Sequence, residues 1–291
     1  MRTLNLAFLT FVAILFSFSS VIQAHDTTEP AHNFIVTGVA KNSSNSILLE
    51  KFKSYLTKHS GIHLNLVYAK NYTDLSKKMH NDPLAIGWTR GVPYVQDHAL
   101  YNQQLIAVPT FNQKPTYYSL VLTDNDRTEK TLADFKGDVL AFSDIRSNSG
   151  FLSPTYALYK QGIDIKKHFR YLLNARNHEG SIVALLNGLA DVAAVDEYIW
   201  LSFIKDDPQA KKKLRIVERM GPYPFTPIVA SKDVTQTDIK KLTAALVNMK
   251  NDDQGKVILK NFVLDGFVEK PHAFYNPIAL MLEYVDIDNA N

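Results

Sequence analysis

Cysteine is missing from the 291 residues of this chain. Its absence excludes disulfides, thiolate metal sites, a cysteine nucleophile and a thiol-linked lipid anchor. The chain also lacks His-Glu-x-x-His, Gly-x-Ser-x-Gly, Gly-x-Gly-x-x-Gly and a glycine-rich phosphate loop with lysine. The nine histidines are dispersed, and His59 and His63 are separated by Ser60-Gly61, which interrupts any helix that would align them. We therefore expect no enzyme, no metal site and no bound cofactor.

An excess of charge of one sign is also missing, since 32 Lys and Arg face 29 Asp and Glu. The basic run at 211–213 is typical of a solvated helix end, so no nucleic-acid partner is expected. A hydrophobic content of 46% argues against disorder.

The amino terminus resembles a secretory signal. Arg2 precedes an apolar run at 6–18, and Ala24 provides a small residue at the expected cleavage site. An uncleaved anchor is the alternative, but this run is shorter than the roughly 20 residues that a membrane span needs. We expect cleavage of residues 1–24, a mature chain that starts near His25 with a formal charge of +2, because Arg2 is lost from +3, and a periplasmic location.

Apolar runs alternate with helix-period stretches along the mature chain, which is the pattern of an α/β protein. Strands are predicted at 33–40, 63–68, 84–88, 139–143, 171–173, 191–195, 215–217 and 228–230, and helices at 46–59, 72–80, 150–161, 179–187, 197–205, 238–250, 257–262 and 277–284. Extended segments at 104–108 and 117–122 are expected to carry the chain between lobes, and the three prolines within 221–227 predict an irregular return. The prediction is two lobes with a cleft between them: residues 25–122 and 228–291 form lobe 1, and the inserted residues 123–227 form lobe 2.

A hydroxyl- and amide-rich turn follows the predicted strand at 139–143 and opens a helix. Ser147, Asn148 and Ser149 can supply donors beside the unpaired N–H groups of the helix start, a combination that binds anions. The same residue types are also common helix caps. The carboxyl ends of parallel strands meet at one edge, where open α/β sheets bind ligands. His178 and Asp196 follow two further strands of this series, so they are expected at the same edge; each can also serve only as a helix-entry residue.

Trp88, Arg90 and Tyr94 lie around a predicted loop after the strand at 84–88. An arginine in such a loop suits bidentate contact with an oxyanion, and the two aromatic rings can form a wall of the cleft. The alternative is a surface arginine paired with a nearby acid. Tyr223 and Phe225 in the 221–227 segment are expected either to approach the cleft or to pack between the lobes.

Several of these segments together resemble one family. Residues 132–137, the turn 143–154, residues 162–164 and the stretch 178–196 are similar to the periplasmic phosphonate- and phosphite-type substrate-binding proteins of ABC transporters. The resemblance covers most of the mature chain and implies a type II periplasmic-binding-protein fold. It also implies that Ser147, Asn148, Ser149 and His178 hold the ligand oxygens, with Asn148 standing where threonine is common.

The chain departs from this family where aminoalkylphosphonate binders carry acids. Tyr198 stands where those proteins place a glutamate, and residues 222–227 contain no acidic residue. Without both carboxylates an ammonium group would be unpaired, so 2-aminoethylphosphonate is not the expected ligand.

Three functions follow, in order of preference. The first is a monomeric receptor that captures a small phosphonate-, phosphite- or phosphate-like oxyanion for an inner-membrane ABC permease. The second is a ligand sensor on the same scaffold, which signals to a membrane protein or binds another solute. The third is a hydrolase built from the acid, histidine and serine side chains of the cleft.

Overall fold

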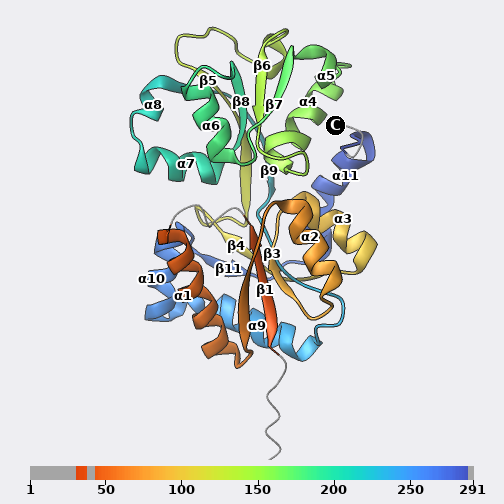
Figure 1. Cartoon of the computed structure of the whole chain (residues 1–291), viewed down its shortest axis with the longest axis vertical. Coiled ribbons are helices and arrows are strands. Elements are labelled where there is room, and N and C mark those ends of the chain that lie inside the picture. Colours follow the sequence, from red (N-terminus) through yellow and green to blue (C-terminus); the bar gives the residue numbers. More distant parts are fainter. Residues whose placement is uncertain (1–30, 38–42, 288–291) are drawn as a thin grey trace, which may run out of the picture.

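Two β-sheets, each with its own helices, form the molecule (Figure 1). The structure is a computed structural model, which describes residues 31–37 and 43–287, with the backbone alone at 43–45. The predicted signal segment, residues 1–24, lies outside the described residues. In the part of the chain that is described, no helix has the length and apolar character needed to cross a bilayer.

A six-stranded sheet holds the N-terminal and C-terminal strands in the order β11-β4-β10-β3-β1-β2. Its strands are β1 (His32–Thr37), β2 (Leu64–Ala69), β3 (Ile86–Trp88), β4 (Gln104–Thr110), β10 (Ile228–Ala230) and β11 (Gly266–Val268). β1 pairs in parallel with β2 and β3, whereas β10 is antiparallel to both β3 and β4. The first βα series predicted from the sequence is therefore present.

The helices of this half are α1 (Ser43–Ser60), α2 (Tyr72–Asn81), α3 (Gly91–Tyr101), α9 (Gln236–Asn248), η3 (Met249–Asn251), α10 (Asp253–Phe262), η4 (His272–Tyr275) and α11 (Asn276–Tyr284). Five of them, α1, α2, α9, α10 and α11, lie where the sequence predicted helices, whereas α3, η3 and η4 were not predicted as separate helices. Local caps set their starts; for example, Asn71 accepts a hydrogen bond from the backbone N–H of Asp74 at 2.8 Å and so fixes the first turn of α2.

A five-stranded sheet holds the middle of the chain in the order β7-β6-β8-β5-β9. Its strands are β5 (Thr116–Asp124), β6 (Val139–Phe142), β7 (Tyr171–Asn174), β8 (Val192–Asp196) and β9 (Leu214–Pro224). Its helices are η1 (Leu132–Asp134), η2 (Asn148–Leu152), α4 (Ser153–Tyr159), α5 (Ile165–His168), α6 (His178–Leu186), α7 (Glu197–Asp206) and α8 (Ala210–Lys213). β6 is parallel to both β7 and β8, so these three strands end at the same edge.

Strand pairing corrects two expectations about the crossings between the halves. β5 pairs with β9 along most of its length and with β8 over 119–123, so residues 116–122 belong to the second sheet, and the first crossing lies between Thr110 and Thr116. β9 continues through Pro222 and Pro224, which were expected to be irregular. Proline is tolerated there because β9 is an edge strand, where a missing donor can face outward.

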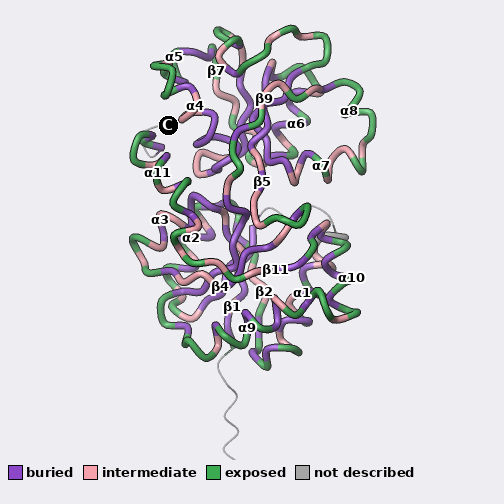
Figure 2. The backbone as a smooth tube through the Cα atoms, turned by 180° about the vertical axis from the view of Figure 1, so that it is seen from behind, coloured by how far each residue is buried: buried purple, intermediate pink, exposed green. Residues whose placement is uncertain are grey.

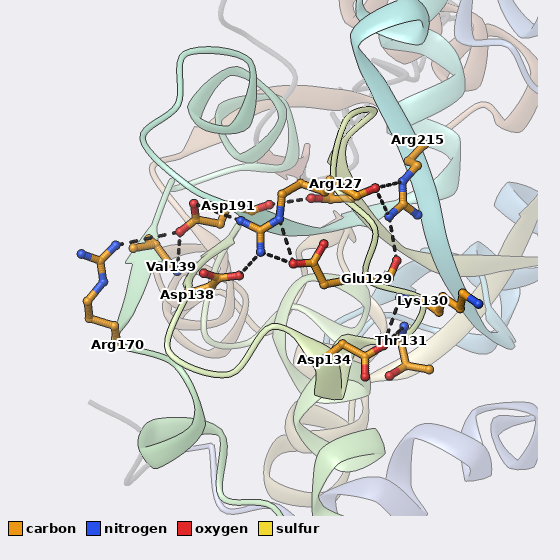
Figure 3. Close-up of polar contacts among 11 residues, drawn as sticks. Arg127, Glu129, Lys130, Thr131, Asp134, Asp138, Val139, Arg170, Asp191 and Arg215 are labelled. Atoms are coloured by element: carbon orange, nitrogen blue, oxygen red, sulfur yellow. Dashed lines mark hydrogen bonds and ion pairs between the residues drawn. The ribbon is translucent and has the colours of Figure 1, made fainter.

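Burial is concentrated inside each half, and the buried segments continue through the junction between them (Figure 2). The helix α11 follows the strands of the first half but packs against both α3 and α4, so it bridges the two halves beside the junction (Figure 1). The N-terminal ends of β6 and β8 lie at the far end of the five-stranded sheet, where an ion-pair network surrounds Arg127 (Figure 3). The opposite ends of the same strands face the six-stranded sheet and carry the candidate site.

Candidate functional site

The three parallel strands of the second sheet end at Phe142, Asn174 and Asp196, and each end leads into a helix. The connections carry Ser147 to Ser149, His178 and Asp196. The structure therefore brings together the three polar segments that the sequence predicted at one edge.

The serine-rich turn after β6 is closed and buried. Ser147 caps η2, with its Oγ accepting the backbone N–H of Gly150 at 3.0 Å. Asn148 and Ser149 begin the helix, and the first N–H groups of a helix have no intrahelical acceptor. The chain continues directly from η2 into α4, so the positive end of this helical segment points toward the turn.

His178 lies against this turn and is 7% exposed. Its Nε2 is 3.3 Å from Ser147 Oγ and 3.4 Å from Ser143 Oγ, a residue that the sequence analysis did not single out. Its Nδ1 accepts the backbone N–H of Asp196 at 3.1 Å, which assigns the proton of the neutral ring to Nε2. Burial, reinforced by the charge of Arg90, lowers the pKa of His178 to about 3. The ring is thus a neutral hydrogen-bond donor aimed at the serine turn.

Asn148 leaves one end of its amide free. Its Nδ2 donates to the Tyr117 hydroxyl at 3.0 Å, and its Oδ1 has no partner among the described residues although it is buried. The two ends of an amide are interchangeable by a flip, so either a donor or an acceptor can face a ligand. Tyr117, on β5, was taken from the sequence only as part of an extended connection, and no local signal marked it as a site residue.

Asp196 ends β8 and caps α7, accepting the backbone N–H of Tyr198 at 2.8 Å. Burial raises the pKa of its carboxyl to about 7, against the opposing influence of Arg90. Glu197 points elsewhere, because it pairs with Arg219 and accepts the backbone N–H of Tyr118 at 3.3 Å. Of the two acids, only Asp196 faces the site.

Arg90 faces this edge from the six-stranded half. It is the N-cap residue of α3, and its Nε donates to the hydroxyl of Tyr72, the first residue of α2, at 3.4 Å. Its guanidinium also lies 5.7 Å from the centre of the Tyr72 ring. Among the described residues no carboxylate lies within ion-pair distance of Arg90. The starts of both helices thus place a polar side chain at the site, Tyr72 at the first position of α2 and Arg90 at the N-cap of α3, and the cation remains available to an anion.

The segment after β3 is a helix, α3, where the sequence predicted a loop. Pro93 within its first turn misled the prediction, although proline is well tolerated at that position because the first N–H groups have no acceptor. As a result Tyr94 points away from the cavity described below. It is fully buried against Tyr275, and its hydroxyl contacts His272 Nδ1 at 2.9 Å. The structure does not place Tyr94 in the wall of the site.

A cavity of about 150 Å³ opens beside Arg90, His178 and Asp196. Aromatic and aliphatic side chains from both halves form much of its wall: Trp88, Tyr198, Phe225, Phe262, Leu48, Ile199, Val263 and Leu264. The Trp88 indole N–H donates to Thr226 Oγ1 at 3.3 Å, and the Tyr198 hydroxyl donates to the carbonyl of Phe262. Because the Trp88 N–H and the Tyr198 hydroxyl are hydrogen-bonded within the protein, both rings present mainly apolar surface to the cavity. Thr37 adds a buried hydroxyl without a partner among the described residues.

The donor set fits an oxyanion better than a metal. Neutral imidazole, serine hydroxyls and a guanidinium are hydrogen-bond donors, and the buried acid that faces them is Asp196. No cluster of three or more potential metal ligands occurs within residues 31–37 and 43–287. Tyr72, Ser143 and Thr37 complete the surroundings, and sequence reasoning missed all three.

Two sheets with a polar site between them, at the carboxyl ends of parallel strands, define a periplasmic binding protein of the type II fold. Three comparisons agree. The family model for the ABC transporter phosphonate periplasmic substrate-binding protein matches residues 38–274. The phosphonates-binding periplasmic protein of Escherichia coli K12 is 25% identical over 256 residues, which cover 84% of this chain and 75% of the relative.

Solved structures show the same architecture. A binding protein component of a phosphonate ABC transporter from Pseudomonas aeruginosa superposes with a TM-score of 0.78 at 20% identity, covering 87% of this chain and 85% of the other. A Prochlorococcus marinus protein in complex with methylphosphonate gives 0.76 at 19% identity, covering 86% and 97%. The chain belongs to the phosphonate-binding family of periplasmic ABC-transporter substrate-binding proteins, which confirms the resemblance noted in its sequence.

Proposed function

We propose that this protein captures a small phosphonate or related phosphorus oxyanion between its two halves and presents it to an inner-membrane ABC permease. The observation that carries the proposal is the orientation of His178. Its Nδ1 is occupied by the Asp196 N–H, so its Nε2–H is directed toward the serine turn regardless of pH above about 3. A neutral donor in a buried turn stabilises an anion without bringing a counter-charge of its own.

Each side chain has a distinct role in this proposal. Ser147, Ser149 and His178 donate to the ligand oxygens, and the free end of the Asn148 amide adds a further contact. Arg90 supplies the positive charge from the opposite half, where no carboxylate of the described part lies within ion-pair distance of it and the Asp196 carboxyl is weakened by burial. Binding in this way requires no covalent step, and we expect the protein to act as a monomer without enzymatic activity.

The cavity next to Arg90 and His178 accounts for the organic part of the ligand. Its wall is largely aromatic and aliphatic, and Tyr198 uses its hydroxyl on Phe262 rather than on the cavity. The acids at its border are Asp196, whose charge is weakened by burial, and Glu179, which is exposed. A ligand ammonium would approach the Arg90 guanidinium without a firm buried counter-ion. We therefore propose that methyl or other uncharged substituents are accepted in preference to aminoalkyl ones.

The test is a thermal-shift and calorimetry panel on residues 25–291, after unfolding and refolding to remove any ligand carried through purification. The panel contains methylphosphonate, ethylphosphonate, 2-aminoethylphosphonate, phosphite, phosphate, sulfate and glutamate. A selective rise in Tm with phosphorus oxyanions is expected because a ligand that binds only the folded state stabilises it. His178→Ala and Ser149→Ala should each weaken binding by about 1–3 kcal/mol. A panel without any response would contradict the proposed ligand class.

A further inference from the structure

Arg146 connects the serine turn to the opposite half of the molecule. It directly precedes Ser147, and its own backbone N–H is fixed by Asp144 Oδ1 at 2.8 Å. Its side chain leaves the turn and reaches two helices of the six-stranded half. The Nη2 atom lies 3.2 Å from Asp97 Oδ1, and Nε donates to Gln96 Oε1 at 2.9 Å, both on α3. Nη1 donates to Ser76 Oγ on α2, also at 2.9 Å.

The two helices that receive Arg146 are the helices that frame the site. α2 starts at Tyr72, one turn before Ser76, and α3 is capped by Arg90, less than two turns before Asp97. One guanidinium therefore ties the turn that carries Ser147 to the pair of helices that carry Tyr72 and Arg90. Planar guanidinium donors hold such geometry more rigidly than a flexible ammonium would.

This contact is buried, which distinguishes it from an ordinary surface ion pair. The side chains of Arg146 and Asp97 are 12% and 3% exposed. The other hydrogen bonds to the Asp97 carboxylate come from neutral donors of the same half, the Ser76 hydroxyl and the Gln103 amide, the latter at 3.4 Å. Without Arg146, the Asp97 carboxylate would stay buried with weak compensation for as long as the halves are together. Separation of the halves would expose it to water, so loss of Arg146 favours separation.

A second contact spans the halves on the other side of the cavity, where the Tyr198 hydroxyl of α7 donates to the Phe262 carbonyl of α10. That bond joins neutral groups. The Arg146 contact combines a charge pair with two further hydrogen bonds, so it is the stronger of these two polar contacts between the halves.

We propose that Arg146 is a positioning residue that holds the serine turn against α2 and α3 in the closed arrangement, and that it slows ligand release without contacting the ligand. The role in release rests on the proposed function, whereas the role in closure does not. If a ligand binds the open arrangement and closure follows, a weaker closed state increases the release rate and leaves the encounter rate unchanged.

The kinetic test uses methylphosphonate as the probe with wild type, Arg146→Gln and Asp97→Asn. We expect koff and Kd to rise at least about tenfold in both variants, with kon within about twofold of wild type. The double variant Arg146→Gln/Asp97→Asn should raise koff by less than the product of the two single-variant factors, because both substitutions act on one contact. Arg170→Gln is the matched control, since its guanidinium is 71% exposed and its ion pair stays within the five-stranded half.

The ligand-free test exploits the absence of cysteine. Spin labels at Lys205→Cys on α7 and Lys256→Cys on α10, two exposed positions on opposite sides of the cavity, report the separation of the halves. Adding Arg146→Gln should enlarge the population with longer distances, and adding Arg170→Gln should not. Should Arg146→Gln fold poorly, Ser76→Ala removes one of the three contacts and is expected to produce a smaller shift in the same direction.

The two proposals fail separately. If wild type binds nothing in the oxyanion panel, the proposed function fails and the distance measurement alone decides the role of Arg146. If wild type binds methylphosphonate but Arg146→Gln retains wild-type koff and wild-type distances, the role assigned to Arg146 is wrong. A rise in Kd through kon alone, with unchanged distances, would also overturn it, because it would place Arg146 in the encounter step.

Discussion

The backbone N–H of Asp196 donates to Nδ1 of His178 at 3.1 Å, so the last residue of β8 fixes the protonation of the first residue of α6. The two side chains are both buried, and burial acts on them in opposite directions. It disfavours the charged form of each, which lowers the pKa of His178 to about 3 and raises that of Asp196 to about 7. Both groups therefore favour the neutral state near the middle of the pH scale.

The first prediction concerns stability against pH. In the unfolded chain the pKa of His178 is near 6.5, so its contribution to the free energy of unfolding is complete above pH 6.5 and is lost as pH falls toward 3. Asp196, with a reference pKa of 3.8, contributes fully below that value, and its contribution is lost as pH rises toward 7. Between about pH 4 and 6.5 the two slopes oppose each other, each with a maximum near 1.4 kcal/mol per pH unit. Wild type should show little net slope from this pair.

Single variants should separate the two opposing pH dependences of the free energy of unfolding, as measured by urea unfolding. In His178→Gln the free energy of unfolding should fall with rising pH relative to wild type across this window, because the Asp196 dependence is no longer offset. In Asp196→Asn, which keeps a good helix cap, it should rise with pH relative to wild type. Two variants with the same pH profile as wild type would show that the pair is not titrating as described.

The second prediction concerns ligand affinity. A bound oxyanion near Asp196 disfavours its ionisation further, so binding is accompanied by proton uptake when the carboxyl is partly ionised. Affinity for methylphosphonate should therefore fall more steeply between pH 6 and 8 in wild type than in Asp196→Asn. The ligand's own titration is common to both proteins and cancels in the comparison by calorimetry. Equal pH profiles would remove Asp196 from the site.

The third prediction concerns Gly150, which packs against the serine turn and His178. A Cβ added there would lie 2.2 Å from Ser143 Oγ and 3.2 Å from His178 Cε1. Gly150→Ala should displace these groups, reducing stability by about 1–3 kcal/mol and methylphosphonate affinity by about tenfold or more. Gly255→Ala is a matched control, because Gly255 lies in α10, away from the turn, and an added Cβ there would lie 2.1 Å from the Met249 carbonyl oxygen. It should reduce Tm with little change in Kd.

The sequence was most informative where local chemistry and chain order decide the structure. Apolar runs and caps located most helices and strands, and parallel strand order placed Ser147, His178 and Asp196 at one edge. The same local reading failed at α3, where a proline in the first turn resembled a loop, and at β5, whose pairing depends on strands far away in the chain.

The side of the site formed by the six-stranded half was harder to predict, because its contacts also join residues that are far apart in the chain. Arg90 was identified from its residue type, but its partner Tyr72 and the free state of its guanidinium depend on how α2 and α3 pack. Tyr94 differs from Arg90 by four positions, yet the helix directs it into the core. The contact of Arg146 with Asp97 joins residues from different halves, and no local pattern specifies such a pair.

The last prediction separates stability from binding by means of the Arg127 network (Figure 3). The Arg127 guanidinium pairs with Glu129 and Asp138, and the Arg127 backbone carbonyl accepts a hydrogen bond from Arg215 Nη2 at 2.8 Å. This network lies at the end of the sheet opposite the site. Because the Arg127 side chain is 33% exposed, solvent screens the pairs, and Arg127→Met should reduce the free energy of unfolding by only about 1–2 kcal/mol. Its methylphosphonate Kd, measured well below Tm, should match wild type, since none of these contacts reaches the turn or the cavity. A clear loss of affinity in Arg127→Met would mean that the two ends of the five-stranded sheet are coupled, and the effects of Gly150→Ala and His178→Gln on binding would then no longer be assignable to local contacts alone.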